Sequence, residues 1–291
     1  MTSPGTLRLG RHTFAPTDRL VMAIVNRTPD SFYDQGATWD ESAALGRIDE
    51  VVAAGAEIVD IGGVPAAPGS TVDIKEELRR TVPFVTAVRA AHPDVVISVD
   101  TWRHEVARAV CDAGADLIND SWGGWDRRLP EVAAECGAAL VCSHAGGLPP
   151  RTRPYRVTYD DVMASVLEHT VALAERAVAA GVDPSRIIID PAHDFGKNTR
   201  HGLEVTRRLG EMTATGWPVL VSLSNKDFVG ETLDAPLAER LVGTLAATSV
   251  SAWLGARIFR AHNVRETRQT LDMVSAILGE RPPVRTVRGL V

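Results

Sequence analysis

The sequence predicts an α/β fold and, within that class, a single (β/α)8 barrel, also called a TIM barrel. Three observations support this prediction: eight short apolar runs, helical patterns between them, and a length of 291 residues. A doubly wound open sheet is the alternative, but its first strand is usually followed by a G-x-G-x-x-G turn. The first turn here reads Asn26-Arg27-Thr28-Pro29-Asp30, which favours the barrel.

The eight predicted strands are near-continuous runs of Val, Ile, Leu and Ala rather than alternating patterns. Such runs are typical of parallel strands that are covered on both faces. We expect strands at residues 20–26, 57–62, 95–100, 116–120, 139–144, 186–190, 218–224 and 257–262.

Helical periodicity fills the segments between these strands. Leu45, Ile48 and Val51 form one apolar stripe, and Leu78, Val82, Val85 and Val88 form another. Glycines stand where several helices should end, a few residues before the next strand: Gly55, Gly114, Gly137, Gly181 and Gly216. The uncharged run 241–256 is short for a membrane span and predicts a buried helix.

The sequence divides into an extension (residues 1–19), a barrel domain (20–280) and a tail (281–291). We expect the extension to form a hairpin that plugs the bottom of the barrel. A formal net charge of −6 gives no overall basic surface for nucleic acid. The first twenty residues lack the apolar core of a signal peptide, so we expect neither secretion nor membrane association. Cys111, Cys136 and Cys142 have no paired spacing, which favours reduced core cysteines and a cytoplasmic location.

Polar residues gather at the carboxyl ends of the predicted strands, where (β/α)8 barrels carry their active sites. Asp100, Asn119 and Asp190 suit the amino and ring N–H donors of a flat heterocycle. Asn26, Arg260 and His262 suit an anion such as a phosphate. The remaining polar residues at these ends are Asp60, Asp120, His144, Lys197 and Lys226. A helix cap or a turn explains any one of them, but not the whole set.

Two other kinds of site are weakly indicated. His193 and Asp194 follow Asp190 closely, yet no second His or Cys pair stands at ligand spacing, so a structural zinc is not expected. Ser143-His144 lacks the strained G-x-S-x-G turn of a serine hydrolase.

The strand-end motifs, taken in order, resemble those of dihydropteroate synthases. The first is Asn26-x-Thr28-Pro29-Asp30-Ser31-Phe32. The others are Asp60-Ile61-Gly62-Gly63, Ser98-Val99-Asp100-Thr101, Ile118-Asn119-Asp120, Asp190-Pro191, Phe195-Gly196-Lys197-Asn198, Leu223-Ser224 with Lys226, and Arg260-x-His262. The resemblance covers roughly residues 18–280.

The resemblance implies a reaction and roles for these residues. Members of the family join 6-hydroxymethyl-7,8-dihydropterin pyrophosphate to p-aminobenzoate and release pyrophosphate. Pterin binding would fall to Asp100, Asn119, Asp190 and Lys226, and pyrophosphate binding to Asn26, Arg260 and His262. Magnesium is the usual counter-ion of the pyrophosphate, with Asn26 as its expected protein ligand. Two loops, at about 28–40 and 64–73, would exclude water.

The chain departs from the family pattern at several of these loops. Where the family has Glu-Ser-Thr-Arg, this chain has Val64-Pro65-Ala66-Ala67. Each lost hydrogen bond to a charged group is worth roughly 1.5–3 kcal/mol. The other departures are Ser143 and Ala145 after the fifth strand, His193 and Asp194 after the sixth, and Asn225 and Asp227 after the seventh. The formal change at the site is about three charge units toward negative, which is unfavourable for a pyrophosphate.

These departures predict a dihydropteroate-synthase paralogue with little or no synthase activity. The alternative is a working synthase in which Arg27 or Arg151 replaces the loop arginine. A third hypothesis is a protein that only binds a pterin or a sulfonamide-like or sulfone-like aryl ligand. A fourth, a pterin-dependent methyltransferase, would need a corrinoid partner, of which the sequence shows no sign. By the same resemblance we expect a homodimer, for which the helices at 236–256 and 264–278 offer an apolar face.

Overall fold

Eight parallel strands form a closed barrel in the computed structural model, which describes residues 5–27, 41–69, 71–152 and 157–288. The strand order is β8-β7-β6-β5-β4-β3-β10-β9, and a parallel bridge between Ile189 and Val219 joins the two ends. The predicted (β/α)8 barrel is therefore confirmed. The strands are β3 (Leu20–Asn26), β4 (Ile58–Gly62), β5 (Val96–Asp100), β6 (Leu117–Asp120), β7 (Ala139–Ser143), β8 (Ile187–Asp190), β9 (Leu220–Ser222) and β10 (Ile258–Ala261).

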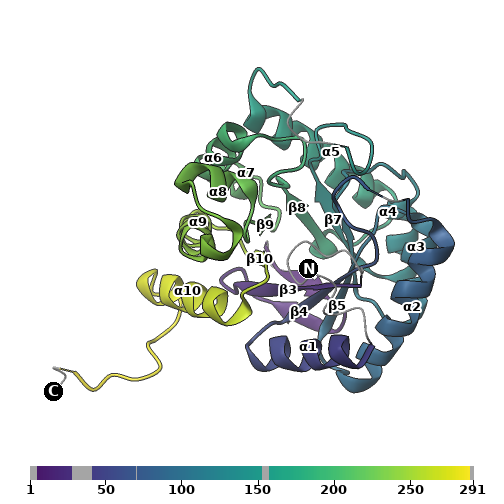
Figure 1. Ribbon diagram of the computed structural model, residues 1–291, viewed down its shortest axis with the longest axis horizontal. Helices are drawn as coiled ribbons and strands as arrows, with labels where there is room; N and C mark the ends of the chain where they lie inside the picture. The colour runs from purple at the N-terminus through teal and green to yellow at the C-terminus, as the bar shows by residue number, and fades with distance from the viewer. Residues whose placement is uncertain (1–4, 28–40, 70, 153–156, 289–291) are drawn as a thin grey trace.

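Helices surround the barrel and alternate with its strands (Figure 1). Side-chain caps start some of them: Asp73 accepts from the Glu76 amide, and Asp161 accepts from the Ala164 amide. The five glycines expected to end helices all have φ between 65° and 112°, where a side chain would be strained. The helices are α1 (Glu41–Ala53), α2 (Ile74–Ala91), α3 (His104–Asp112), α4 (Leu129–Cys136), α5 (Val162–Ala179), α6 (Thr199–Arg207), α7 (Leu209–Thr213), α8 (Asp227–Leu233), α9 (Leu241–Trp253) and α10 (Val264–Ile277), with 3-10 turns at Pro184–Arg186 and Leu237–Glu239.

The strands are apolar throughout because each one contacts two cores. In β3, Leu20 and Met22 point into the barrel, whereas Val21, Ala23 and Val25 pack against the helices. Because successive side chains of a strand point to opposite faces, a strand covered on both sides needs an uninterrupted apolar run.

A short antiparallel hairpin lies across the amino-terminal end of the barrel. It consists of β1 (Leu7–Leu9) and β2 (His12–Phe14). Leu7 and Leu9 are fully buried and pack with Leu20 and Met22 in the barrel interior. At the other end of the chain, residues 281–288 leave α10 and are exposed (Figure 1).

The uncharged segment 241–256 forms a helix, but the prediction that this helix is buried was wrong. In α9, Val242 is 78% exposed and Trp253 is 58% exposed. A segment of low charge can be buried within the chain or can form an apolar face on the outside, and α9 forms an outer face. No helix in the described ranges is long and apolar enough to cross a membrane.

Candidate functional site

The strand register places the expected site residues at one level of the barrel mouth. Asn26 pairs with Gly62, Gly62 with Asp100, and Asp100 with Asn119 across four neighbouring strands. On the opposite side, β7 and β8 end together at Ser143 and Asp190. Parallel pairing therefore gathers residues that lie up to 164 positions apart in the chain at one rim.

Asp60 of β4 is the centre of the polar contacts below this rim. Its carboxylate is fully buried and accepts hydrogen bonds from Ser98 (2.6 Å), Asn119 (3.2 and 3.3 Å) and Arg260 (2.6 Å). An ionised carboxylate is stable in such a place only when its oxygens are satisfied. Sequence reasoning noted Asp60 but gave it no role. The available signal was a carboxylate inside an otherwise apolar strand.

Arg260, which the resemblance assigns to pyrophosphate binding, contacts Asp100, which the resemblance assigns to pterin binding. Its Nε donates to Asp60, and its Nη2 lies 3.3 Å from Oδ2 of Asp100. An expected pterin residue and an expected pyrophosphate residue are thus in direct contact. The guanidinium is already paired with two carboxylates, which reduces the positive potential that it can offer to an anion.

His262, the second residue expected to bind pyrophosphate, carries no charge at neutral pH. Burial, together with the nearby cations Arg260 and Lys226, lowers the pKa of His262 to about 3. Its Nδ1 lies 3.0 Å from the Ser224 hydroxyl, a partner that sequence reasoning did not assign. A neutral imidazole can donate a hydrogen bond to an anion but adds no charge.

Three carboxylates near the mouth have raised pKa values because they are buried. The pKa of Asp100 is about 6, that of Asp190 about 6 and that of Asp120 about 7. Backbone amides partly offset the burial: Ala192 donates to Asp190 at 2.7 Å, and Gly124 donates to Asp120 at 2.7 Å. These acids therefore change charge close to neutrality and can act as acceptors or donors for a heterocycle.

Asp194 lies at the amino end of α8 beside Lys226. Its Oδ2 accepts from the Asp227 amide at 2.9 Å, and burial raises the pKa of Asp194, an effect that the charge of Lys226 partly offsets. Lys226 extends over the ring of Phe195, with Nζ 5.1 Å from the ring centre. The carboxylate of Asp194 therefore offsets part of the positive charge of Lys226, the residue that the resemblance assigns to pterin binding.

The neighbouring departures Asn225 and Asp227 are held by a residue from the α9 side. Arg240 donates to the carbonyl oxygen of Asn225 at 2.9 Å and pairs with the carboxylate of Asp227 at 3.0 Å. Asn225 has a φ of 59°, a conformation that asparagine adopts more readily than most residues. Arg240 thus neutralises Asp227.

Lys197, the other lysine beyond a strand, is buried behind the mouth. Its Nζ lies 2.8 Å from Nδ1 of His144, 2.8 Å from the His144 carbonyl oxygen and 3.0 Å from the Phe195 carbonyl oxygen. Burial lowers the pKa of Lys197 to about 7. Lys197 donates its hydrogen bonds to the loops after β7 and β8. It therefore stabilises these loops rather than presenting a charge to a ligand.

The loop that replaces Glu-Ser-Thr-Arg packs as part of an apolar cluster. Val64 is partly buried against Trp102 and Trp122, and the same cluster includes Ala145 and Phe195. Trp122 meets Phe195 edge-on, with ring centres 4.9 Å apart. Pro65 is partly buried, and Ala66 and Ala67 are exposed. The side chains of Val64, Pro65, Ala66 and Ala67 offer no hydrogen bonds to a ligand.

Two arginines donate hydrogen bonds to the backbone of the loop at residues 64–73. Arg151 donates to the Ala67 carbonyl oxygen at 2.9 and 3.1 Å, and Arg103 donates to the Val72 carbonyl oxygen at 2.7 Å. Arg103 also pairs with the fully buried carboxylate of Glu77. Arg27 lies over the ring of Phe84 on α2, with its guanidinium carbon 4.6 Å from the ring centre. Arg27 and Arg151 are therefore engaged within the fold.

Within the described ranges, Ser143, His193 and Asp194 do not belong to a cluster of possible metal ligands. The His193 ring stacks on Phe228 at 5.5 Å, and its Nε2 lies 3.0 Å from the Thr206 hydroxyl. Burial lowers the pKa of His193 to about 3. The Ser143 hydroxyl is buried without a hydrogen-bond partner. Ser143 pairs with Asp190 in the strand register, but the hydrogen bond made by the Asp190 carboxylate is to the Ala192 amide of its own loop.

The residues at Asn26 do not by themselves form a magnesium site. Mg²⁺ takes six oxygen ligands, and Asn26 contributes a single neutral amide oxygen. The nearby carboxylates Asp60 and Asp100 are paired with Arg260. A pyrophosphate and water would have to supply the remaining ligands. The motif Thr28–Phe32, including Asp30, and the loop at 28–40 lie outside the described residues.

The fold and the mouth together define a (β/α)8 barrel whose carboxyl-terminal rim carries acceptors for a heterocycle. Comparison with known proteins gives the same class. The model of the family "Pterin binding enzyme" matches residues 22–262. The chain is 37% identical over 262 residues to the dihydropteroate synthase of Escherichia coli, covering 90% of this chain and 92% of that protein. The chain belongs to the pterin binding enzyme family, as a relative of the dihydropteroate synthases.

Two further comparisons refine this placement. A protein named inactive dihydropteroate synthase 2, from Mycobacterium tuberculosis, is 59% identical over 275 residues, which are 93% of this chain and 86% of that protein. The crystal structure of Yersinia pestis dihydropteroate synthase with a sulfonamide drug superposes with a TM-score of 0.88 at 34% identity. That match covers 95% of this chain and all of the Yersinia chain.

Proposed function

We propose that this protein is a dihydropteroate-synthase-like barrel that lacks efficient synthase activity and retains weak binding of a pterin or an aryl ligand of the sulfonamide or sulfone type. The relatives that share 59% identity carry a name that states inactivity, and the more distant relative is named as the synthase itself. This pattern agrees with the departures at the barrel mouth.

One observation carries the proposal: residues 64–67 of the loop after β4 all have apolar side chains. Val64 packs against Trp102 and Trp122, and the backbone of the loop is held by Arg151 and Arg103. Where the resemblance implies hydroxyl and guanidinium groups for p-aminobenzoate, this loop supplies methyl groups and proline rings. Losing two or three hydrogen bonds to charged groups corresponds to roughly a hundredfold to a millionfold in transition-state binding.

The anion side supports the same conclusion. Arg260 is paired with Asp60 and Asp100, and Asp194 opposes Lys226. A departing pyrophosphate needs uncompensated cations or donors to stabilise its developing charge. The charges at this mouth largely neutralise one another.

Catalytic inactivity is tested by direct assay of the purified protein. We expect dihydropteroate formation from 6-hydroxymethyl-7,8-dihydropterin pyrophosphate and p-aminobenzoate, with magnesium present, to be at least about a hundredfold slower than for an authentic synthase assayed alongside. We also expect no rescue of a synthase-deficient strain. Ordinary turnover would contradict the proposal and establish the alternative, an active synthase.

Residual pterin binding is supported by the acceptors that remain at the mouth. Asp100, Asn119 and Asp190 stay at the ends of β5, β6 and β8, as the resemblance requires. The relative solved with a sulfonamide drug shares the barrel at a TM-score of 0.88. Binding of 6-hydroxymethylpterin and of a sulfonamide can be measured by calorimetry, and no detectable heat with either would remove this part of the proposal.

Replacing Asp194 with glycine is expected to strengthen binding of the pterin pyrophosphate by about tenfold at low salt. The change removes a carboxylate beside Lys226. It should be tolerated because Asp194 has a φ of 69°, which glycine adopts without strain. Asp194→Asn is the matched control, since it removes the charge but keeps an oxygen for the Asp227 amide. If neither variant gains affinity in calorimetry, Asp194 does not weaken anion binding.

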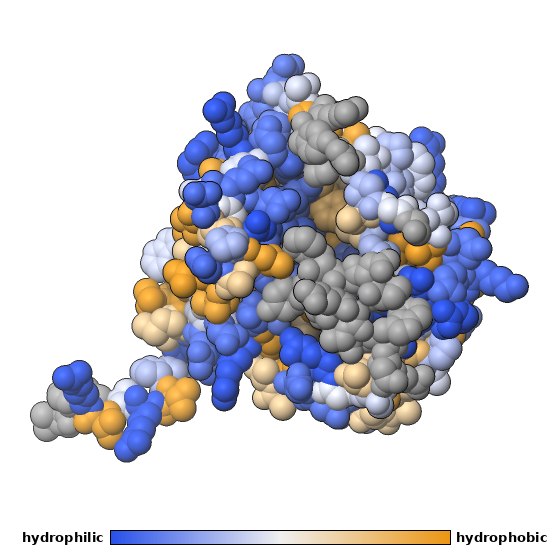
Figure 2. Space-filling model, in the orientation of Figure 1, coloured by the Kyte–Doolittle hydropathy of each residue, from blue (hydrophilic) through white to orange (hydrophobic). Residues whose placement is uncertain are grey.

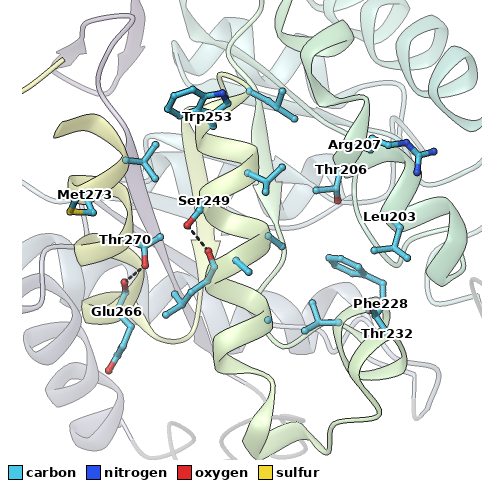
Figure 3. A pocket seen from close by; sticks show the side chains of 18 of the residues that line it. Leu203, Thr206, Arg207, Phe228, Thr232, Ser249, Trp253, Glu266, Thr270 and Met273 are labelled. Carbon is cyan, nitrogen blue, oxygen red and sulfur yellow. Dashed lines mark hydrogen bonds between the residues drawn. The ribbon is translucent and has the colours of Figure 1, made fainter. Parts of the chain in front are cut away.

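We further propose that the protein is a homodimer that pairs through α9 and α10. A groove of about 1130 Å³ runs over α6, α8, α9 and α10, and Figure 3 shows Trp253, Met273 and Leu203 around it. Trp253, Met273 and Ile277 are 58–61% exposed. Figure 2 shows hydrophobic side chains gathered over this side of the barrel. An exposed apolar surface of this extent is typical of an interface.

We also propose a cytoplasmic location. Cys111, Cys136 and Cys142 are free thiols, which suits a reducing compartment. Fractionation of cells that express a tagged chain would test this, and recovery outside the cytoplasmic fraction would contradict it.

A further inference from the structure

The Asp100 carboxylate is held by two donors from neighbouring strands. The Ser121 hydroxyl, just after β6, donates to Oδ1 of Asp100, and Arg260 of β10 donates to Oδ2 at 3.3 Å. The shorter bond of Arg260, at 2.6 Å, goes to Asp60. The closer donor to Asp100 is therefore an uncharged hydroxyl and not the guanidinium.

The turn after β6 aims this hydroxyl at β5. The backbone N–H of Ser121 donates to the Asn119 carbonyl oxygen at 3.2 Å. The carboxylate of Asp120 folds back to accept from the amides of Trp122 (3.1 Å) and Gly124 (2.7 Å). These bonds fix the turn. The Ser121 side chain then faces the neighbouring strand.

The charged groups around Asp100 come from four elements. They are Arg260 on β10, Asp60 on β4, Glu77 on α2 and Asp120 on β6. The pKa of Asp100 is raised to about 6: burial and the neighbouring carboxylates raise it, and Arg260 and the Ser121 hydroxyl partly offset this rise. With three carboxylates close by, a donor that favours the ionised form has a measurable effect.

We propose that Ser121 is a positioning residue, whose hydroxyl holds the Asp100 carboxylate ionised and oriented to accept hydrogen bonds from a bound pterin. This inference rests on the pterin binding proposed above. A pterin presents an amino group and ring N–H groups, which need acceptor oxygens. A protonated Asp100 would turn one of its two oxygens into a donor and lose part of this match.

The first test is made on the protein without ligand. Carboxyl ¹³C NMR, with the Asp100 signal assigned from the Asp100→Asn variant, follows its titration in the parent, Ser121→Ala and Ser121→Thr. We expect a midpoint near pH 6 in the parent, a rise of about half a unit to one unit in Ser121→Ala, and a parent-like midpoint in Ser121→Thr. An unchanged midpoint in Ser121→Ala would overturn the proposal.

The second test measures the affinity for 6-hydroxymethylpterin by calorimetry at pH 5.5 and pH 8. We expect Ser121→Ala to weaken binding by roughly threefold to tenfold at pH 5.5 and by less at pH 8, because Asp100 is ionised in both proteins at the higher pH. Ser251→Ala, which removes a buried hydroxyl on α9, should bind like the parent.

The outcomes separate this inference from the pterin proposal. An equal loss at both pH values that threonine does not rescue would show a merely structural role and overturn the inference. If the parent fails to bind 6-hydroxymethylpterin, the pterin proposal falls, and with it the ligand that Ser121 was proposed to serve. The NMR midpoint would then still report whether the hydroxyl controls the charge of Asp100.

Discussion

Replacing Asp60 with alanine is expected to lower the free energy of unfolding by about 3–5 kcal/mol, a large part of the about 5–15 kcal/mol that stabilises a typical domain. Asp60 is fully buried and accepts hydrogen bonds from Ser98, Asn119 and Arg260. The alanine variant would leave a buried guanidinium with Asp100 as its remaining carboxylate partner at 3.3 Å, and it would remove the acceptor of two further donors. Urea unfolding followed by circular dichroism measures the effect.

Two controls define the cause of this destabilisation. Asp94→Ala removes an exposed carboxylate that pairs with Arg11 and should change stability little. The double variant Asp60→Ala/Arg260→Met removes the orphaned cation together with its partner, so it should lose less stability than Asp60→Ala alone. A loss below about 1 kcal/mol for Asp60→Ala would show that the mouth does not depend on this carboxylate.

Replacing Trp253 with glutamate is expected to convert the proposed dimer to a monomer, with a rise of about a hundredfold or more in the dimer dissociation constant. Trp253 is 58% exposed at the end of α9 and lines the groove together with Met273 and Ile277 of α10. Figure 3 shows Trp253 and Met273 at this groove. Large aromatic side chains at the centre of an interface contribute about 2–4 kcal/mol each, and a carboxylate there would be buried without a partner. Light scattering over a concentration series measures the change.

Trp125→Glu provides the matched control. Trp125 is 53% exposed and lies between β6 and α4, away from the groove, so the same substitution there should leave the molecular mass unchanged. A parent protein that is monomeric at all concentrations would contradict the dimer proposal. If Trp253→Glu remains a dimer, the dimer interface lies on another surface of the protein.

The architecture was largely predictable from local patterns. Apolar runs located the eight strands to within two residues at every end, and five glycines, all of which have positive φ, located helix ends. These signals are local because a strand covered on both faces must be apolar throughout, and because glycine alone adopts that helix-ending conformation without strain. The exposure of α9 was missed because a low charge does not say whether the apolar surface contacts the chain itself or a second molecule.

The chemistry of the site was only partly predictable. Strand-end residues such as Asp100 and Asn119 could be assigned to one rim, since parallel strands end on the same side. The roles of Asp60 and Ser121 could not be assigned, because each depends on a partner in a distant part of the sequence. The sequence could not show that Arg151, a candidate to replace the loop arginine, donates its hydrogen bonds to the Ala67 carbonyl oxygen.

The amino-acid sequence by itself determined the barrel, the level at which the polar residues lie and the loss of polar side chains from the loop after β4. Only the tertiary structure decided which charges remain available to a ligand: Arg260 is paired with Asp60 and Asp100, and Asp194 opposes Lys226. The physical reason is that hydrophobic periodicity depends only on residues close together in the sequence, whereas the pairing of charges depends on distances across the barrel.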